Sequence, residues 1–196
     1  MATHPALNGK RGKSHCRFEP YLDNKIYIMK DIIYIENFLE NHLELMGDLI
    51  SNVCWDDRML SRKTASFGKA YNYSQITYAE IEFPSSLDII KSNIAKVIGF
   101  EPNNCLINYY LDGKSKMGFH SDQVDMLHDS TGIVIISLGD TRVFRFRNIK
   151  DKDVYKEYVL KPGSLFCMSS EVQSEWQHSV LKGENERISL TFRKVK

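Results

Sequence analysis

The sequence after Gly99 consists of short runs rich in β-branched and aromatic residues. Glycine, aspartate and proline separate these runs, which predicts strands joined by tight turns. The runs are residues 105–110, 132–138, 141–146, 154–160, 165–168, 177–181 and 187–192. Many short strands that follow two helices predict an α+β fold, in which helices cover one side of a β-sandwich or β-barrel.

Two stretches before this region have the spacing of amphipathic helices. Between residues 35 and 53, apolar residues recur every three or four positions and would share one helix face. A second helix can be capped by Ser85 or Ser86 and ends at Gly99. Its inward positions are Leu87, Ile90, Ile94 and Val97.

The length of 196 residues fits one domain, which we place at residues 18–196. Residues 1–17 carry four basic residues and no acid, which predicts a flexible basic tail; an arm that contacts phosphates is the alternative. The formal net charge of +1 gives no global argument for a polyanionic partner.

The four cysteines form no CxxC pair, and no apolar N-terminal segment is typical of a signal peptide or a membrane span. We therefore expect a soluble intracellular protein in a reducing compartment, cytoplasmic or nuclear, without membrane contact. We also expect a monomer.

The residues most typical of a metal site are His120 and Asp122, followed far downstream by His178. Residues two apart in a strand or at its exit project to the same side, so the first two can converge on one ion. Two imidazoles and one carboxylate form a facial triad that suits non-haem Fe(II) and leaves three positions open. Zinc hydrolysis is less well supported, because the chain has no HExxH motif.

A second candidate feature is the run of residues 187–193 near the C-terminus. Strand alternation puts Arg187, Ser189, Thr191 and Arg193 on one face. Two arginines on an inward face require an anion, and a dicarboxylate fits the fork of a guanidinium. A solvated strand face with ordinary surface arginines is the alternative.

Together these segments resemble the AlkB family of 2-oxoglutarate oxygenases, over roughly residues 61–194. The resembling segments are 106–110 (LINYY), 112–113 (DG), 120–122 (HSD), 137–139 (SLG), 144–146 (FRF), 162–165 (PGSL), 177–179 (QHS) and 187–193 (RISLTFR). The resemblance implies a double-stranded β-helix (jelly roll) core supported by N-terminal helices, and a dioxygenase that uses Fe(II), 2-oxoglutarate and O2.

The resemblance also implies residue roles. His120, Asp122 and His178 would be the iron ligands, and Arg187 would bind the distal carboxylate of 2-oxoglutarate. The other cosubstrate residues would be Asn108, Tyr110, Ser189 and Arg193. Many family members have asparagine at position 189, so the serine keeps a polar group but shortens it.

Residues 61–74 resemble the nucleotide-recognition lid of AlkB-like nucleic-acid demethylases. Arg62 and Lys63 could contact phosphates, and Tyr71 or Tyr73 could stack an extruded base against His120. Ser74 and Asp125 complete the candidate substrate residues. The alternative is a covering loop whose tyrosines finish the core.

Two departures from the family pattern bear on the substrate. Many family demethylases have an acidic residue two places after the metal aspartate, where this chain has Val124 and the nearest acid is Asp125. Residues 51–58 are too short for the long hairpin that some relatives push into duplex DNA. Single strands or small molecules are therefore the more accessible substrates.

The leading hypothesis is oxidative demethylation of N-alkylated bases in single-stranded DNA or RNA, as in DNA repair, with release of formaldehyde, succinate and CO2. The alternative is the same chemistry on a small metabolite or a protein side chain. A third reading is a nucleic-acid-binding module without activity, which need not keep the triad and both arginines.

Overall fold

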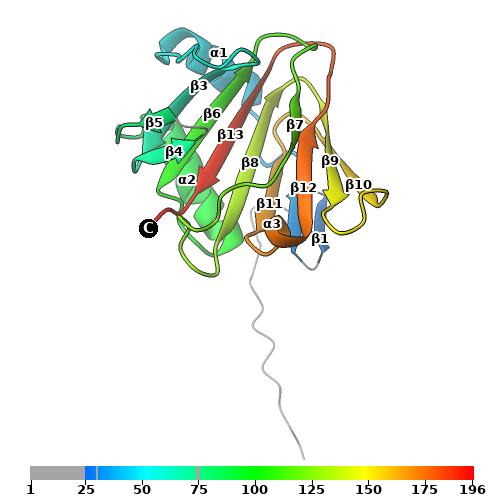
Figure 1. The fold of residues 1–196 in the computed structure, drawn as a ribbon. Coiled ribbons are helices and arrows are strands. Elements are labelled where there is room, and N and C mark those ends of the chain that lie inside the picture. Colours follow the sequence, from blue (N-terminus) through cyan, green and yellow to red (C-terminus); the bar gives the residue numbers. More distant parts are fainter. Residues whose placement is uncertain (1–24, 30, 74–75) are drawn as a thin grey trace, which may run out of the picture.

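The computed structural model of the protein describes residues 25–29, 31–73 and 76–196 (Figure 1). Two antiparallel sheets form a jelly roll, which confirms the predicted double-stranded β-helix. The larger sheet has the order β1 (Ile26–Met29), β2 (Ile32–Ile35), β11 (Leu165–Ser169), β8 (Gly132–Gly139), β13 (Arg187–Arg193), β6 (Asn104–Tyr110), β3 (Lys63–Gly68). The smaller sheet has the order β10 (Tyr155–Leu160), β9 (Arg142–Asn148), β12 (Trp176–Val180), β7 (Met117–His120).

All seven strands predicted after Gly99 are present, with ends shifted by at most two residues. Strands β1, β2, β3 and β7 were not predicted, because they are short or lie at sheet edges where alternation is weak. Part of the expected lid, β3, is an edge strand paired with β6. The expected lid also contains β4 (Tyr71–Tyr73). This strand forms a separate two-stranded sheet with β5 (Ile76–Tyr78), which lies just beyond the lid.

The second predicted helix is α2 (Ser85–Ile98). Gly99 follows it in the left-handed conformation, with φ of 80°, as a C-terminal glycine should. The first helix is shorter than predicted, because α1 spans only His42–Asn52. Ile35 instead ends β2 and pairs with Leu165 of β11. The helical spacing therefore extended the prediction into the end of a strand, because Ile35 packs in the same apolar cluster as the buried residues of α1.

Two apolar clusters result from this arrangement. The first lies between the helices and the outer face of the larger sheet, where Ile188, Leu190 and Phe192 of β13 pack with α1 and α2. The second lies between the two sheets, around Phe144, Phe146 and Phe166. Alternation along β13 consequently sends its two arginines into the space between the two sheets. Every residue of the strand is buried, on one face or the other.

No helix among the described residues is long and apolar enough to cross a membrane. The predicted basic tail, residues 1–17, lies outside the described residues. A single domain over residues 18–196 stays a prediction.

Candidate active site

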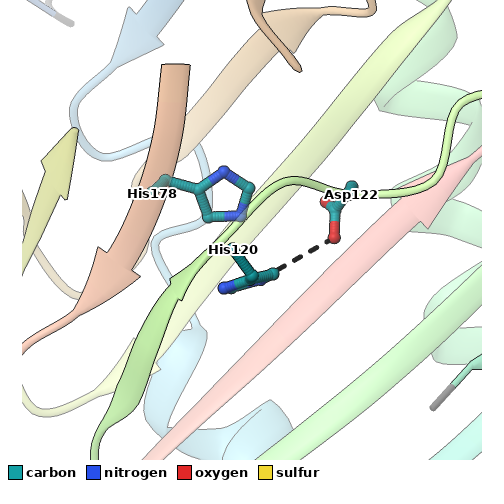
Figure 2. Close-up of side chains that lie close together, drawn as sticks. All are labelled: His120, Asp122 and His178. Atoms are coloured by element: carbon teal, nitrogen blue, oxygen red, sulfur yellow. Dashed lines mark ion pairs between the residues drawn. The ribbon is translucent and has the colours of Figure 1, made fainter. Parts of the chain in front are cut away.

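The pairing of β7 with β12 places two histidines directly opposite each other. His120 is the last residue of β7 and His178 is its partner in β12, with the ring centroids 4.3 Å apart. Asp122 lies two residues beyond the end of β7, in the loop that crosses in front of the larger sheet (Figure 2). One ligand atom from each of the three residues lies within 4.8 Å of the other two. The three ligand atoms therefore converge, with the aspartate at the exit of β7, as the spacing of the sequence allowed.

One hydrogen bond, from Nδ1 to the backbone, fixes the orientation of the His120 ring. Its Nδ1 lies 2.9 Å from the carbonyl oxygen of Gly118, so that nitrogen carries the proton and donates. The Nε2 atom is then the lone-pair nitrogen, 3.9 Å from Oδ1 of Asp122. His178 is buried, and its Nδ1 has no hydrogen-bond partner among the described residues.

The electrostatic environment favours the ligating forms of Asp122 and His178. Burial opposes ionisation of Asp122, but the charge and hydrogen bond of Arg193, together with interactions with the two histidines, outweigh it, and the pKa of this carboxyl is lowered. Arg193 Nη2 lies 3.3 Å from Oδ2 of Asp122. Burial lowers the pKa of His178 to about 4, so its imidazole is neutral at physiological pH. Metal binding needs these forms, an ionised carboxylate and neutral imidazoles.

Arg187 of β13 has the environment of an anion-binding arginine. Its side chain is buried, its Nε donates to Oγ of Ser137 at 3.0 Å, and its Nη1 has no partner among the described residues. Burial lowers the pKa of this guanidinium to about 10, despite the opposing influence of Tyr110 and Asp140. A buried charge of this kind is costly until an anion pairs with it. A carboxylate of 2-oxoglutarate would pair with this buried charge. The alternative of a solvated strand face with ordinary surface arginines does not agree with the burial of Arg187.

The predicted cosubstrate residues lie around the triad. A small interior cavity is lined by the triad together with Asn108, Tyr110, Ser189 and Arg193. The ring of Tyr110 reaches towards Arg187, whose guanidinium carbon is 5.7 Å from the ring centroid. The structure thus brings the iron and cosubstrate candidates together between the two sheets.

A second, open cavity of about 810 Å³ lies outside the triad. Residues 59–62, 117–121 and 123 line it, so that His120 borders both this cavity and the interior one. Pockets of this size bind drug-sized ligands, and a nucleotide falls within that range. The cavity gives an external molecule a direct approach to the triad.

Two candidate substrate residues lie differently from the sequence prediction. Arg62 was expected to reach phosphates, but its side chain is buried and its Nε donates to Oδ1 of Asn108 at 2.6 Å. Tyr71 was expected to stack on a base, but its ring is buried and lies 4.8 Å from the guanidinium carbon of Arg193. Arg62 directly precedes β3 and Tyr71 begins β4, and both side chains are buried.

The remaining candidates are less informative. Asp125 and Val124 are both exposed in the loop after the triad, with 36% of Val124 accessible. The side chain of Tyr73 and residue Ser74 lie outside the described part of the structure.

Sequence reasoning missed two polar side chains that support the site. Ser137, the partner of Arg187, stands in a segment that resembles the family, but no role was assigned to it. Gln173 accepts a hydrogen bond from the backbone N–H of Asp122 at 2.9 Å. No local pattern could identify Gln173, because its partner is 51 residues away.

Comparisons with known proteins agree with this geometry. The sequence model of the 2OG-Fe(II) oxygenase superfamily matches residues 42–193. An uncharacterized protein of Acanthamoeba polyphaga mimivirus is 30% identical, over 86% of this chain and 92% of that protein. The alpha-ketoglutarate-dependent dioxygenase alkB homolog 3 of Rattus norvegicus is 31% identical, over 77% of this chain and 59% of that protein.

Two further matches extend the comparison. The DNA oxidative demethylase ALKBH2 of Homo sapiens is 31% identical, over 68% of this chain and 56% of that protein. The chain thus spans less than two thirds of these two named relatives, alkB homolog 3 and ALKBH2. The structure of OsALKBH1 has the same fold, with a TM-score of 0.70 at 17% identity, and covers 86% of this chain and 100% of that one. The chain belongs to the 2OG-Fe(II) oxygenase superfamily, whose members use Fe(II), 2-oxoglutarate and O2, and it is an AlkB-like dioxygenase of that superfamily.

Proposed function

We propose that the protein oxidatively demethylates N-alkylated nucleobases in single-stranded DNA or RNA. The observation that carries this proposal is the position of His120 in the wall between the two cavities. A methylated base that enters the open cavity would meet the triad from the side opposite the cosubstrate. The names of the relatives, among them a DNA oxidative demethylase, support a nucleic-acid substrate.

In this proposal His120, Asp122 and His178 hold the iron. Arg187 binds the distal carboxylate of 2-oxoglutarate, with Tyr110 beside it, and Arg193 lies near the metal-chelating end. Asn108 and Ser189 contribute polar contacts from neighbouring strands, where they are register partners across β6 and β13. When bound, iron and 2-oxoglutarate supply hydroxylation of a substrate C–H bond, with O2 consumed and succinate and CO2 released.

The chain's own residues would bind the iron and the cosubstrate and orient them. The jelly roll buries Asp122 and His178, and the hydrogen bond that His120 donates to Gly118 keeps one imidazole nitrogen free for the metal. Arg193 holds Asp122 in its charged form. The hydroxymethyl group on the ring nitrogen would then leave as formaldehyde: its O–H proton is released, the C–N bond breaks, and the electron pair of that bond returns to the ring nitrogen.

A small metabolite or a protein side chain is the second candidate substrate. Three observations favour it: Val124 stands where many family demethylases have an acid, Arg62 faces inward, and the ring of Tyr71 is covered. Val124 has no polar atom to offer a base, the ring of Tyr71 is covered, and Arg62, although it lines the open cavity, uses its Nε to bind Asn108. The open cavity accepts either class of molecule.

Succinate release separates the two candidates. Purified protein would be assayed with Fe(II), ascorbate and 2-oxoglutarate, with and without an oligonucleotide that carries 1-methyladenine or 3-methylcytosine. His120→Ala protein serves as the blank, and the unmethylated oligonucleotide is the matched control.

Methyl-dependent stimulation of succinate release, with an equal amount of formaldehyde, is the expected result. Metal-dependent turnover that no single-stranded DNA or RNA stimulates would refute the nucleic-acid proposal. In that case a screen of metabolites and peptides by the same assay tests the second candidate.

A further inference from the structure

We propose that Gln173 is a positioning residue that holds the metal ligand Asp122 in place from its backbone side. The inference rests on the proposed triad of His120, Asp122 and His178. It concerns a residue outside the two cavities and outside the segments that resemble the family.

The geometry around Asp122 shows why it needs such a support. Asp122 lies in the loop beyond β7, where no strand pairing fixes its backbone. Its side chain is almost fully buried, and its N–H donates to Oε1 of Gln173 at 2.9 Å. Loss of this acceptor would leave the half-buried N–H of Asp122 without a partner. The loop that carries Asp122 would then be less restrained.

The chemistry of the bond also fixes how the glutamine amide is turned. A backbone N–H can only donate, so the oxygen of the Gln173 amide must face Asp122. Its Nε2 then faces Sδ of Met168 at 3.2 Å, which is a weak acceptor. The side chain of Gln173 is buried, with 6% exposed. The bond to Asp122 is therefore the strong one of the two that this buried amide makes.

Gln173 also connects two ligands of the triad through one short segment. It lies in α3 (Val172–Glu175), which leads directly into β12 and His178. A second bond joins the same two segments, since Oγ of Ser121 donates to the carbonyl oxygen of Trp176 at 3.3 Å. Movement of α3 would change the separation of Asp122 and His178.

Asp122 is thus held at both ends. Arg193 contacts its carboxylate, and Gln173 contacts its backbone N–H. Loss of a group that orients a metal ligand typically costs 10- to 100-fold in metal affinity. We expect Gln173→Met, which keeps the length but loses the acceptor, to weaken metal binding by about tenfold or more.

The test measures metal affinity without turnover. Mn(II), a redox-stable substitute for Fe(II), would be titrated into the full chain, and free Mn(II) would be read from its electron paramagnetic resonance signal. Gln173→Met is compared with wild type and with Ser174→Ala. The control removes a side-chain bond from the exposed side of the same short helix, the one to Glu171 O at 2.8 Å.

The expected result is a dissociation constant for Mn(II) that rises about tenfold or more in Gln173→Met and less than twofold in Ser174→Ala. Turnover of Gln173→Met should recover when Fe(II) is raised, because the Fe(II) requirement changes more than the maximal rate. If Gln173→Met does not fold, Gln173→Asn replaces it, since its shorter amide cannot reach Asp122, and it must show the same loss.

An Mn(II) affinity within twofold of wild type in a folded Gln173 variant would overturn the inference. So would a loss of affinity that Ser174→Ala matches, because that result indicates a general effect of α3. His178→Ala separates this failure from that of the proposed function. If His178→Ala binds Mn(II) normally, the triad itself is wrong.

Discussion

Replacement of Arg187 by lysine tests the cosubstrate site most directly. In the structure, Nε of this arginine donates to Ser137 and Nη1 has no partner among the described residues. A guanidinium can serve the serine and a carboxylate at once, whereas a lysine ammonium on a flexible stem cannot reproduce this fork. Arg187→Lys should therefore lose one charge-assisted hydrogen bond to 2-oxoglutarate.

The magnitude follows from that single bond. A hydrogen bond to a charged group contributes about 2 kcal/mol, which corresponds to roughly thirtyfold in affinity. We expect the 2-oxoglutarate KM to rise roughly thirtyfold, while the maximal rate changes much less. Ligand-induced stabilisation should fall too, from about 2.7 kcal/mol at a hundredfold excess over Kd to about 0.9 kcal/mol at the same concentration.

The assay is succinate release against 2-oxoglutarate concentration at saturating Fe(II), with thermal unfolding in the presence of Mn(II) as the second measurement. Arg142→Lys is the matched control. Arg142 is as deeply buried, but its Nη2 donates to the backbone oxygens of Asp112 and Asn185 at 3.0 and 2.6 Å. The control should lower Tm and leave the KM unchanged. A KM in Arg187→Lys within threefold of wild type would refute the assignment of Arg187.

Three further predictions concern the metal, a carboxylate and the thiols. His178→Ala should abolish both Mn(II) binding and succinate release, since it removes one of three ligands; retained binding would exclude the triad. The pKa of Asp140 is lowered despite its burial, because the backbone N–H groups of Asn185 and Glu184 and the charge of Arg142 favour the carboxylate. Its contribution to stability is therefore complete well above pH 3.8 and is lost as the pH falls through its lower folded-state pKa. Asp140→Asn should cost about 2 kcal/mol at pH 7, and this cost should shrink as the pH is lowered below 3.8, measured by urea unfolding. In a Cys16→Ser protein, a maleimide should label exposed Cys54 rapidly but buried Cys105 and Cys167 only after denaturation, since burial raises the pKa of Cys167 to about 12; rapid labelling of all three would contradict the burial.

The local patterns of the sequence predicted seven of the strands and the types of metal ligand. Alternation along residues 187–193 was enough to separate the arginines from Ile188, Leu190 and Phe192, because a strand has a period of two whatever it packs against. The α2 helix was equally predictable, since its apolar spacing and its terminal glycine agree. Identification of the metal candidates needed only their chemistry and the order of the family segments.

The tertiary structure alone decided where those side chains lie. His120 and His178 are 58 positions apart, and only the pairing of β7 with β12 sets them opposite each other. Arg62 looks like a surface cation in the sequence, yet the pairing of β3 with β6 brings its neighbourhood beside Asn108 and turns it inward.

The contact between Gln173 and Asp122 also could be found only from the tertiary structure. No local pattern identifies Gln173 as a support of Asp122, because the two residues are 51 positions apart and meet only through the path of a loop. Local structure depends on the spacing of apolar residues and on the conformational preference of each residue, and both can be read from a short segment of the sequence. Contacts between distant segments depend on sheet register and loop path, which are set only when the whole core packs.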